Sequence, residues 1–173
     1  MKTLLRNAVL GLAGAALMIG TGVASAAQST TTFQVQAAVV ANCLVTANSL
    51  AFGTYNPLAA DLDVNTQVLV RCTNGTGYTV KLDAGTTSGA TLAQRKMVFG
   101  GTNFMNYNLY TTAGRTTIFG DGSGTTGTVT GTGAGLGAGQ AQTVDIFGRI
   151  PTGQDTLPIG TYTEAMITVT VEF

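Results

Sequence analysis

The sequence predicts an all-β protein: an immunoglobulin-like β-sandwich that lacks one strand and is completed by a donor strand. Three observations predict this fold. Short runs of alternating apolar and polar residues recur along the chain, and turn-forming Gly and Asn residues separate them. One of the longest alternating runs continues to the last residue. Helical periodicity is nearly absent after the first segment, so no helical layer is expected.

Residues 1–26 have the pattern of a secretory signal peptide. Lys2 and Arg6 give a positive start, an apolar stretch runs from Ala8 to Ile19, and Ala24-Ser25-Ala26 fits an A-x-A cleavage site. The apolar stretch is too short for a stable membrane span. We therefore expect an exported mature chain that begins directly after this segment.

The remaining 147 residues are enough for one domain with its own core. Without Lys2 and Arg6, six basic residues stand against eight acidic ones, which gives a net charge of about −2. Only 9% of the full sequence is charged. This composition provides no basic field for nucleic acid or for an anionic membrane surface.

Cys43 and Cys72 are the two cysteines of the chain. In an exported protein an even pair of cysteines predicts a disulfide. A metal site is disfavoured because the sequence contains no histidine to complete a ligand set.

The expected strands alternate apolar and polar side chains. The first, Thr31–Val40, places Phe33, Val35, Ala37 and Val39 on one face. The next four are expected at 64–72, 78–83, 105–110 and 144–150. The last of these is apolar on both faces, which predicts a central strand.

The final expected strand carries an uninterrupted apolar face, formed by Ala165, Ile167, Val169, Val171 and Phe173. An immunoglobulin-like sandwich normally has one more strand after this position, to cover the core and pair the edge. Because nothing follows, we expect an open apolar groove beside this strand.

Turn residues lie between the expected strands, as at Asn74-Gly75, Asp83-Ala84-Gly85 and Asp121-Gly122. Residues 120–140 are rich in Gly, Thr and Ser and are expected to form a long, mobile hairpin or loop.

Two hypotheses account for the strand at Thr31–Val40. In the first, it fills the groove of a neighbouring subunit by β-augmentation. Each subunit then donates at one site and accepts at another, which produces an open fibre. In the second, the strand folds back into its own domain and gives a monomeric binding module, for example for carbohydrate. Periodicity alone leaves both open.

Several motifs carry a resemblance to a known family. They cover nearly the whole mature chain: Phe33-Gln34-Val35-Gln36-Ala37, Asn42-Cys43, Leu50-Ala51-Phe52-Gly53-Thr54-Tyr55, Val70-Arg71-Cys72-Thr73-Asn74-Gly75, Tyr107-Asn108-Leu109-Tyr110, Ile146-Phe147-Gly148-Arg149-Ile150-Pro151, Gly160-Thr161-Tyr162 and Thr168-Val169-Thr170-Val171. With these motifs in this order, the sequence resembles the spore coat protein U domain family.

The resemblance implies a secreted subunit of archaic chaperone–usher pili, linked to adhesion and biofilm formation. It implies three partners: neighbouring pilus subunits, a periplasmic chaperone and an outer-membrane usher. The implied organisation is a donor extension at 27–41 and a pilin domain at 42–173. The donor strand would include Thr31, Ala165–Phe173 would edge the acceptor groove, and Cys43 would pair with Cys72. A spore or cyst coat protein is the alternative that the family name implies.

No enzyme, cofactor or small-molecule substrate is expected. The missing histidine removes the usual general base. Asp61 and Asp63 could form a carboxylate pair, but a solvated loop before a strand is the simpler interpretation. Glu164 and Glu172 share the outward face of the last strand and lie too far apart to act together.

Overall fold

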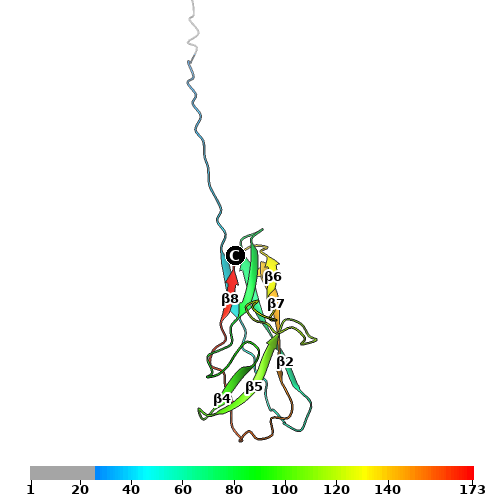
Figure 1. The fold of residues 1–173 in the computed structure, drawn as a ribbon. Coiled ribbons are helices and arrows are strands. Elements are labelled where there is room, and N and C mark those ends of the chain that lie inside the picture. The colour runs from blue at the N-terminus through cyan, green and yellow to red at the C-terminus, as the bar shows by residue number, and fades with distance from the viewer. Residues whose placement is uncertain (1–25) are drawn as a thin grey trace, which may run out of the picture. The chain divides into compact units, whose positions relative to one another are not determined.

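The computed structural model describes residues 26–173, and the chain divides into two units, 1–37 and 38–173. The expected signal peptide, apart from its last residue, lies outside the described residues. Residues 26–37 have no regular secondary structure. The second unit contains all the described strands and is an all-β sandwich of two sheets, as predicted (Figure 1). Within residues 26–173, no helix has the length and apolar character needed to cross a membrane.

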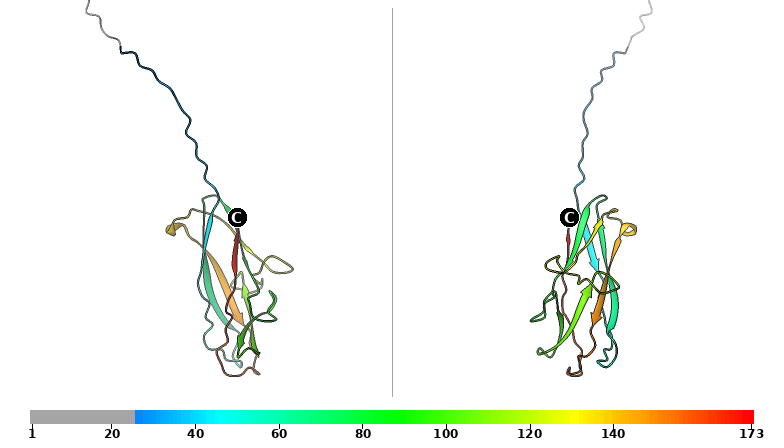
Figure 2. Two further views of the ribbon diagram at one scale, coloured as in Figure 1. Left: turned by 90° about the vertical axis from the view of Figure 1, so that its left-hand side faces the viewer. Right: turned by 45° about the vertical axis from the view of Figure 1, so that its right-hand side comes forward.

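The larger sheet has five antiparallel strands in the order β1-β2-β7-β5-β4. Their bounds are Cys43–Ala47 for β1, Leu62–Cys72 for β2, Arg95–Phe99 for β4, Asn103–Tyr110 for β5 and Gln142–Ile150 for β7. The smaller sheet has the order β6-β3-β8, with β3 at Gly77–Leu82, β6 at Val129–Thr132 and β8 at Val169–Glu172. A short 3-10 turn, η1, lies at Ala138–Gln140. Figure 2 shows β1 and β8 next to each other, and the two strands are in contact.

The core lies between the two sheets and is built from the alternating apolar faces. Its buried residues include Val68 and Val70 from β2, three residues from β3 and three from β5, and Val144, Ile146 and Ile150 from β7. The strands predicted at 64–72, 78–83, 105–110 and 144–150 are therefore confirmed. β7 lies at the centre of the larger sheet, as its two apolar faces predicted.

The sequence predicts a long, mobile hairpin or loop at 120–140, and the structure has a strand within this segment. Residues 129–132 form β6, which pairs with β3 at the edge of the smaller sheet. Gly131 lies against the ring of Tyr78, where a Cβ atom would clash with it. The glycine that reads as a loop signal in the sequence is here a close-packing position in a strand.

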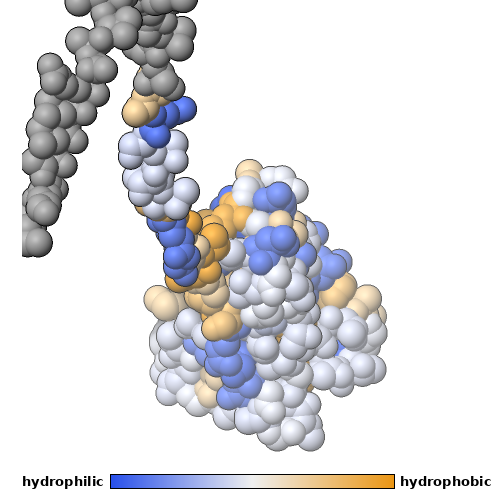
Figure 3. Space-filling view, turned by 90° about the horizontal axis from the view of Figure 1, so that it is seen from above, coloured by the Kyte–Doolittle hydropathy of each residue, from blue (hydrophilic) through white to orange (hydrophobic). Residues whose placement is uncertain are grey.

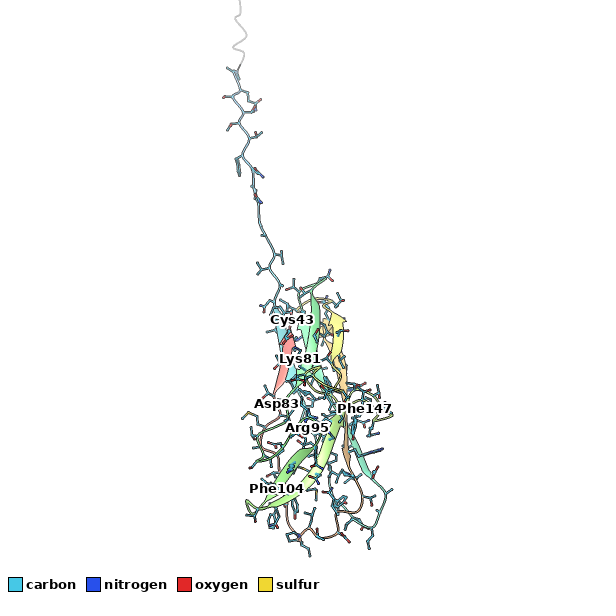
Figure 4. All side chains as sticks on the ribbon, in the orientation of Figure 1. Cys43, Lys81, Asp83, Arg95, Phe104 and Phe147 are labelled. Atoms are coloured by element: carbon cyan, nitrogen blue, oxygen red, sulfur yellow. A yellow bond between two sulfur atoms is a disulfide. The ribbon has the colours of Figure 1, made fainter. Side chains whose placement is uncertain are left out.

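Arg95 of β4 is completely buried, which no pattern in the sequence predicts. Its guanidinium donates hydrogen bonds to the carbonyl oxygen of Asp83 (2.6 and 2.9 Å) and to that of Phe119 (2.7 Å). Figure 4 labels Arg95 and Asp83 in the middle of the domain. Burial lowers the pKa of Arg95, but the guanidinium remains charged because its reference value is so high. Arg95 therefore joins β4 to two separate loops.

Candidate functional site

A groove with a volume of about 1000 Å³ opens along one side of the sandwich, and we call it the edge groove. One wall is formed by residues 47–55 and Pro57, and the other by residues 157–167 and Val169. Its floor consists of core side chains from β4, β5, β7 and the end of β3: Leu82, Met97, Met105, Tyr107, Leu109, Ile146 and Ile150. The edge groove is therefore a place where the apolar core reaches the surface of the domain.

The floor of the edge groove is apolar apart from the hydroxyl of Tyr107. Phe52 of the first wall packs edge-on against Tyr107, with ring centroids 5.9 Å apart. Burial and the nearby carboxylate of Glu164 raise the pKa of Tyr107, so its hydroxyl stays neutral. On the face seen in Figure 3, much of the domain surface is pale, with several strongly hydrophilic areas and one clear apolar area.

Each wall of the edge groove contains the edge strand of one sheet. β8 pairs with β3, and the N–H of Asp83 donates to the carbonyl of Thr168. Successive residues of a strand direct their N–H and C=O groups to opposite edges. The backbone groups of Ile167, Val169 and Val171 therefore face away from β3, toward the edge groove.

The opposite wall begins with β1, which pairs with β2. Within the described part of the chain, no backbone hydrogen bond joins residues 43–57 to residues 157–173. Among the described residues, the two sheets therefore meet at this side without backbone hydrogen bonds between the two walls.

The residues predicted to edge an acceptor groove take different positions. Ala165, Ile167 and Val169 line the edge groove. Val171 lies in β8 opposite Val80, and Phe173 is 60% exposed. The sequence did not identify residues 47–57 as a wall by periodicity, although the motif Leu50–Tyr55 contributes to the family resemblance.

The prediction of one continuous strand over Ala165–Phe173 is wrong, because the strand covers Val169–Glu172. Two carboxylates hold the preceding residues instead. Glu164 accepts hydrogen bonds from the N–H groups of Thr86 and Thr87, both 3.0 Å, and of Met166 at 3.2 Å. Asp83 Oδ1 accepts the N–H of Thr168 at 2.9 Å. These side-chain bonds replace part of a backbone ladder.

The carboxylate of Glu164 is ionised at neutral pH. Desolvation opposes its charge, but the hydrogen bonds from Thr87, Thr86 and Met166 outweigh desolvation and lower the pKa of Glu164 to about 2. Glu164 therefore acts as a fixed acceptor that holds one wall of the edge groove against the turn after β3.

The far end of the edge groove is held by Tyr55 and Gln154. Tyr55 donates its hydroxyl to the carbonyl of Pro151 at 2.9 Å and accepts the N–H of Gln154 at 3.1 Å. The side-chain amide of Gln154 also bonds to both backbone groups of Asn106 in β5. The wall is thus tied to the larger sheet at this end.

The residues predicted as a donor strand lie in no sheet of this chain. Thr31–Val40 has no secondary structure, and Phe33, Val35 and Val39 are 86%, 82% and 87% exposed. Thr31 and Ala37 are exposed as well. An isolated extended segment has no partner for its backbone groups, which explains why its alternating pattern alone does not make a strand.

Cys43 and Cys72 form a disulfide, as predicted. They are directly opposite each other in the pairing of β1 with β2. The bond fixes the start of β1 and, through it, one wall of the edge groove.

Asp61 and Asp63 both form ion pairs with Arg149. The expectation that Asp61 and Asp63 lie on a loop is wrong for Asp63, which is in β2. Arg149 donates to both oxygens of Asp63 at 2.8 Å, and its Nη1 lies 3.2 Å from Asp61. The hydrogen bond from Arg149 lowers the pKa of Asp63, as expected for an ion pair. Among the described residues, no group of three or more His, Cys, Asp or Glu side chains could hold a metal ion.

The comparisons with known proteins agree on one kind of protein. No curated protein matches the sequence. A solved structure matches with a TM-score of 0.54 and 25% identity, namely the CsuC–CsuE chaperone–tip adhesion subunit pre-assembly complex from archaic chaperone–usher Csu pili of Acinetobacter baumannii. The match covers 78% of this chain and 40% of that one. The profile of the Spore Coat Protein U domain matches residues 29–170. The chain therefore belongs to the Spore Coat Protein U domain family.

Proposed function

We propose that this protein is a structural subunit of a surface pilus that polymerises by donor-strand complementation. One observation carries the proposal: two unpaired sheet edges enclose a groove over the core, while an alternating apolar segment of the same chain lies in no sheet. The family membership and the similarity to a chaperone–usher pilus complex support it.

The donor segment, Thr31–Val40, matches the edge groove in chemistry. Phe33, Val35, Ala37 and Val39 would enter the apolar floor, and the backbone of the donor would pair with the open edge of β8. Ten extended residues span about 33 Å. At roughly 25 cal/mol per Å² of apolar area, four such side chains contribute several kcal/mol before ordering costs.

This mode of assembly defines the partners. The donor of one subunit fills the acceptor of the next, so the interface is heterologous and generates an open fibre. Before assembly, a periplasmic chaperone would cover the edge groove. At an outer-membrane usher, the donor strand of the next subunit would then replace the chaperone. The proposed organisation is a signal peptide at 1–26, a donor extension at 27–41 and a pilin domain at 42–173. The pilus would support adhesion and biofilm formation. A spore or cyst coat layer, favoured by the family's description, is a second candidate.

A deletion of residues 27–41 tests the proposal. The truncated subunit should keep its groove but form no polymer, and it should be recovered only with a chaperone or with an added peptide of sequence 27–41. A scrambled peptide of the same composition is the matched control. Size-exclusion chromatography and electron microscopy measure polymer formation. If the truncated chain is as stable alone as the full chain, or still forms fibres, the proposal is wrong.

A further inference from the structure

A second hollow lies on the outward face of β2 and β7, and three of its lining residues, Asn48, Ser49 and Thr66, also line the edge groove. Its volume is about 450 Å³, within the range of small-ligand sites. We call it the outer cleft. Its lining residues are Asn48, Ser49, Asn65, Thr66, Gln67, Asp145 and Phe147. Six of the seven have polar side chains, whereas the floor of the edge groove is apolar.

The wall of the outer cleft is a fixed structure. The hydroxyl of Thr66 lies 3.2 Å from the carbonyl of Asn48 and 3.1 Å from that of Ser49, and it donates to both. The N–H of Asn48 donates to the carbonyl of Gln67 at 3.0 Å. These bonds hold the chain where it leaves β1, so the wall keeps its position beside β2.

The floor consists of two cross-strand pairs, Asn65 with Phe147 and Gln67 with Asp145. The amide of Gln67 donates to Asp145 Oδ1 at 3.2 Å. This leaves Asp145 Oδ2 and Gln67 Oε1 as acceptors toward the cleft. Asn65 Oδ1 accepts from Arg115 at 3.3 Å, which leaves the amide hydrogens of Asn65 as donors.

Arg115 donates a hydrogen bond to Asn65 and has an unusual backbone conformation. Its φ of 52° is the one positive value among the described non-glycine residues. Its guanidinium lies 3.2 Å from Asp63 and 5.8 Å from the ring centre of Phe147. Strained conformations of this kind are concentrated at functional sites. The charge of Arg115 is balanced by Asp63, so it gives the cleft no net positive field.

We propose that the outer cleft binds a neutral saccharide through one pyranose ring. A pyranose presents several hydroxyl groups, each both donor and acceptor, which match the mixed amide, hydroxyl and carboxylate lining. Phe147 supplies apolar surface for the C–H groups of the ring. The carboxylate of Asp145 disfavours anionic ligands, and no cationic side chain lines the cleft to offset its charge. This site goes beyond the proposed function and does not depend on polymerisation.

The test uses the purified full chain and four sugars: D-glucose, D-galactose, D-mannose and N-acetyl-D-glucosamine. Saturation-transfer NMR detects binding up to about 10 mM, since isolated sugar sites are weak. Amide shift mapping locates it, and the shifts should be centred on Ser49, Asn65, Gln67 and Asp145. The variants Asp145→Ala and Asn65→Ala should each weaken binding about tenfold, because each removes a polar contact.

Asp155→Ala is the matched control, because Asp155 is an exposed carboxylate outside the cleft. It should bind the sugar as the unmodified chain does. Three outcomes overturn the proposal: none of the four sugars binds, the shifts lie away from the outer cleft, or Asp145→Ala binds as tightly as Asp155→Ala. Polymer formation, measured on the same variants, should remain unchanged, so a failure here is distinguishable from a failure of the pilus assignment.

Discussion

Arg95 donates a hydrogen bond to the side-chain oxygen of Asn108 across 2.6 Å, and both residues lie in the core of the sandwich. Asn108 in turn donates to the carbonyls of Leu92 and Ala93 at 3.2 and 2.8 Å. The two side chains thus satisfy backbone groups from the loops around β4 and β5. Because Arg95 and Asn108 are themselves buried, solvent does not replace a lost hydrogen bond of their side chains, and the pair is expected to be essential for stability.

The first prediction is that Arg95→Met destabilises the domain by about 3–5 kcal/mol, because it leaves the carbonyls of Asp83 and Phe119 without a donor and removes one of the two hydrogen bonds to Asn108 Oδ1. Urea unfolding of the disulfide-intact protein measures this. Arg71→Met is the control, since no side-chain hydrogen bond of Arg71 occurs in the described residues, and it should change stability by less than about 0.5 kcal/mol. Equal effects of the two substitutions would contradict the role given to Arg95.

The second prediction concerns acid stability and Glu164. Its pKa of about 2 in the folded protein lies below that of the unfolded chain. The stabilisation is therefore complete above about pH 4.5 and is lost as the pH falls toward about 2. Glu164→Gln should lower stability at pH 7 by about 1–2 kcal/mol. The variant should also lose less stability than the unmodified protein between about pH 4.5 and about pH 2, the range that we call the acid limb.

Glu172→Gln is the matched control for this experiment. Glu172 pairs with Lys81 at 2.7 Å, but its side chain is 57% exposed, so its loss should cost less than about 1 kcal/mol. Unfolding curves between pH 2 and pH 7 compare the two variants. An acid limb that is unchanged in Glu164→Gln would show that other groups cause it.

The third prediction is that Val35→Asp abolishes polymer formation while the subunit is still exported. A donor strand would bury this carboxylate in the apolar edge groove, where its desolvation is costly, so polymer yield should fall at least about tenfold. Gln34→Asp is the control, because Gln34 lies on the opposite face of the same segment. Polymers from surface extracts are measured by electron microscopy. Normal polymers from Val35→Asp would exclude this face as the inserted one.

The fourth prediction is that replacing both Cys43 and Cys72 by Ser lowers stability by about 3–4 kcal/mol, as expected for a loop with a sequence separation of 29. Unfolding with and without reductant measures the effect. The unmodified protein should become as unstable as the variant when reduced, and the variant should not respond to reductant. A response of the variant would show that reductant acts elsewhere.

The alternating pattern was sufficient to predict a strand that has one buried face and a neighbouring strand on each side. β2, β3, β5 and β7 follow the sequence because a shift of one residue would expose their apolar faces. The disulfide was also predictable, since two cysteines allow one pairing. The same reasoning failed at β1, β4 and β6, because short edge strands carry little periodicity and depend on their neighbours for pairing.

By itself, the sequence determined the all-β class, the central strands, the disulfide and the family. The tertiary structure alone decided the edge groove, because its wall at 47–57 and its floor come from segments far apart in the chain. It also decided that Arg95 is buried and that Glu164 caps the turn after β3. Such polar contacts depend on which backbone groups the fold leaves without partners, and no local pattern of residues records that.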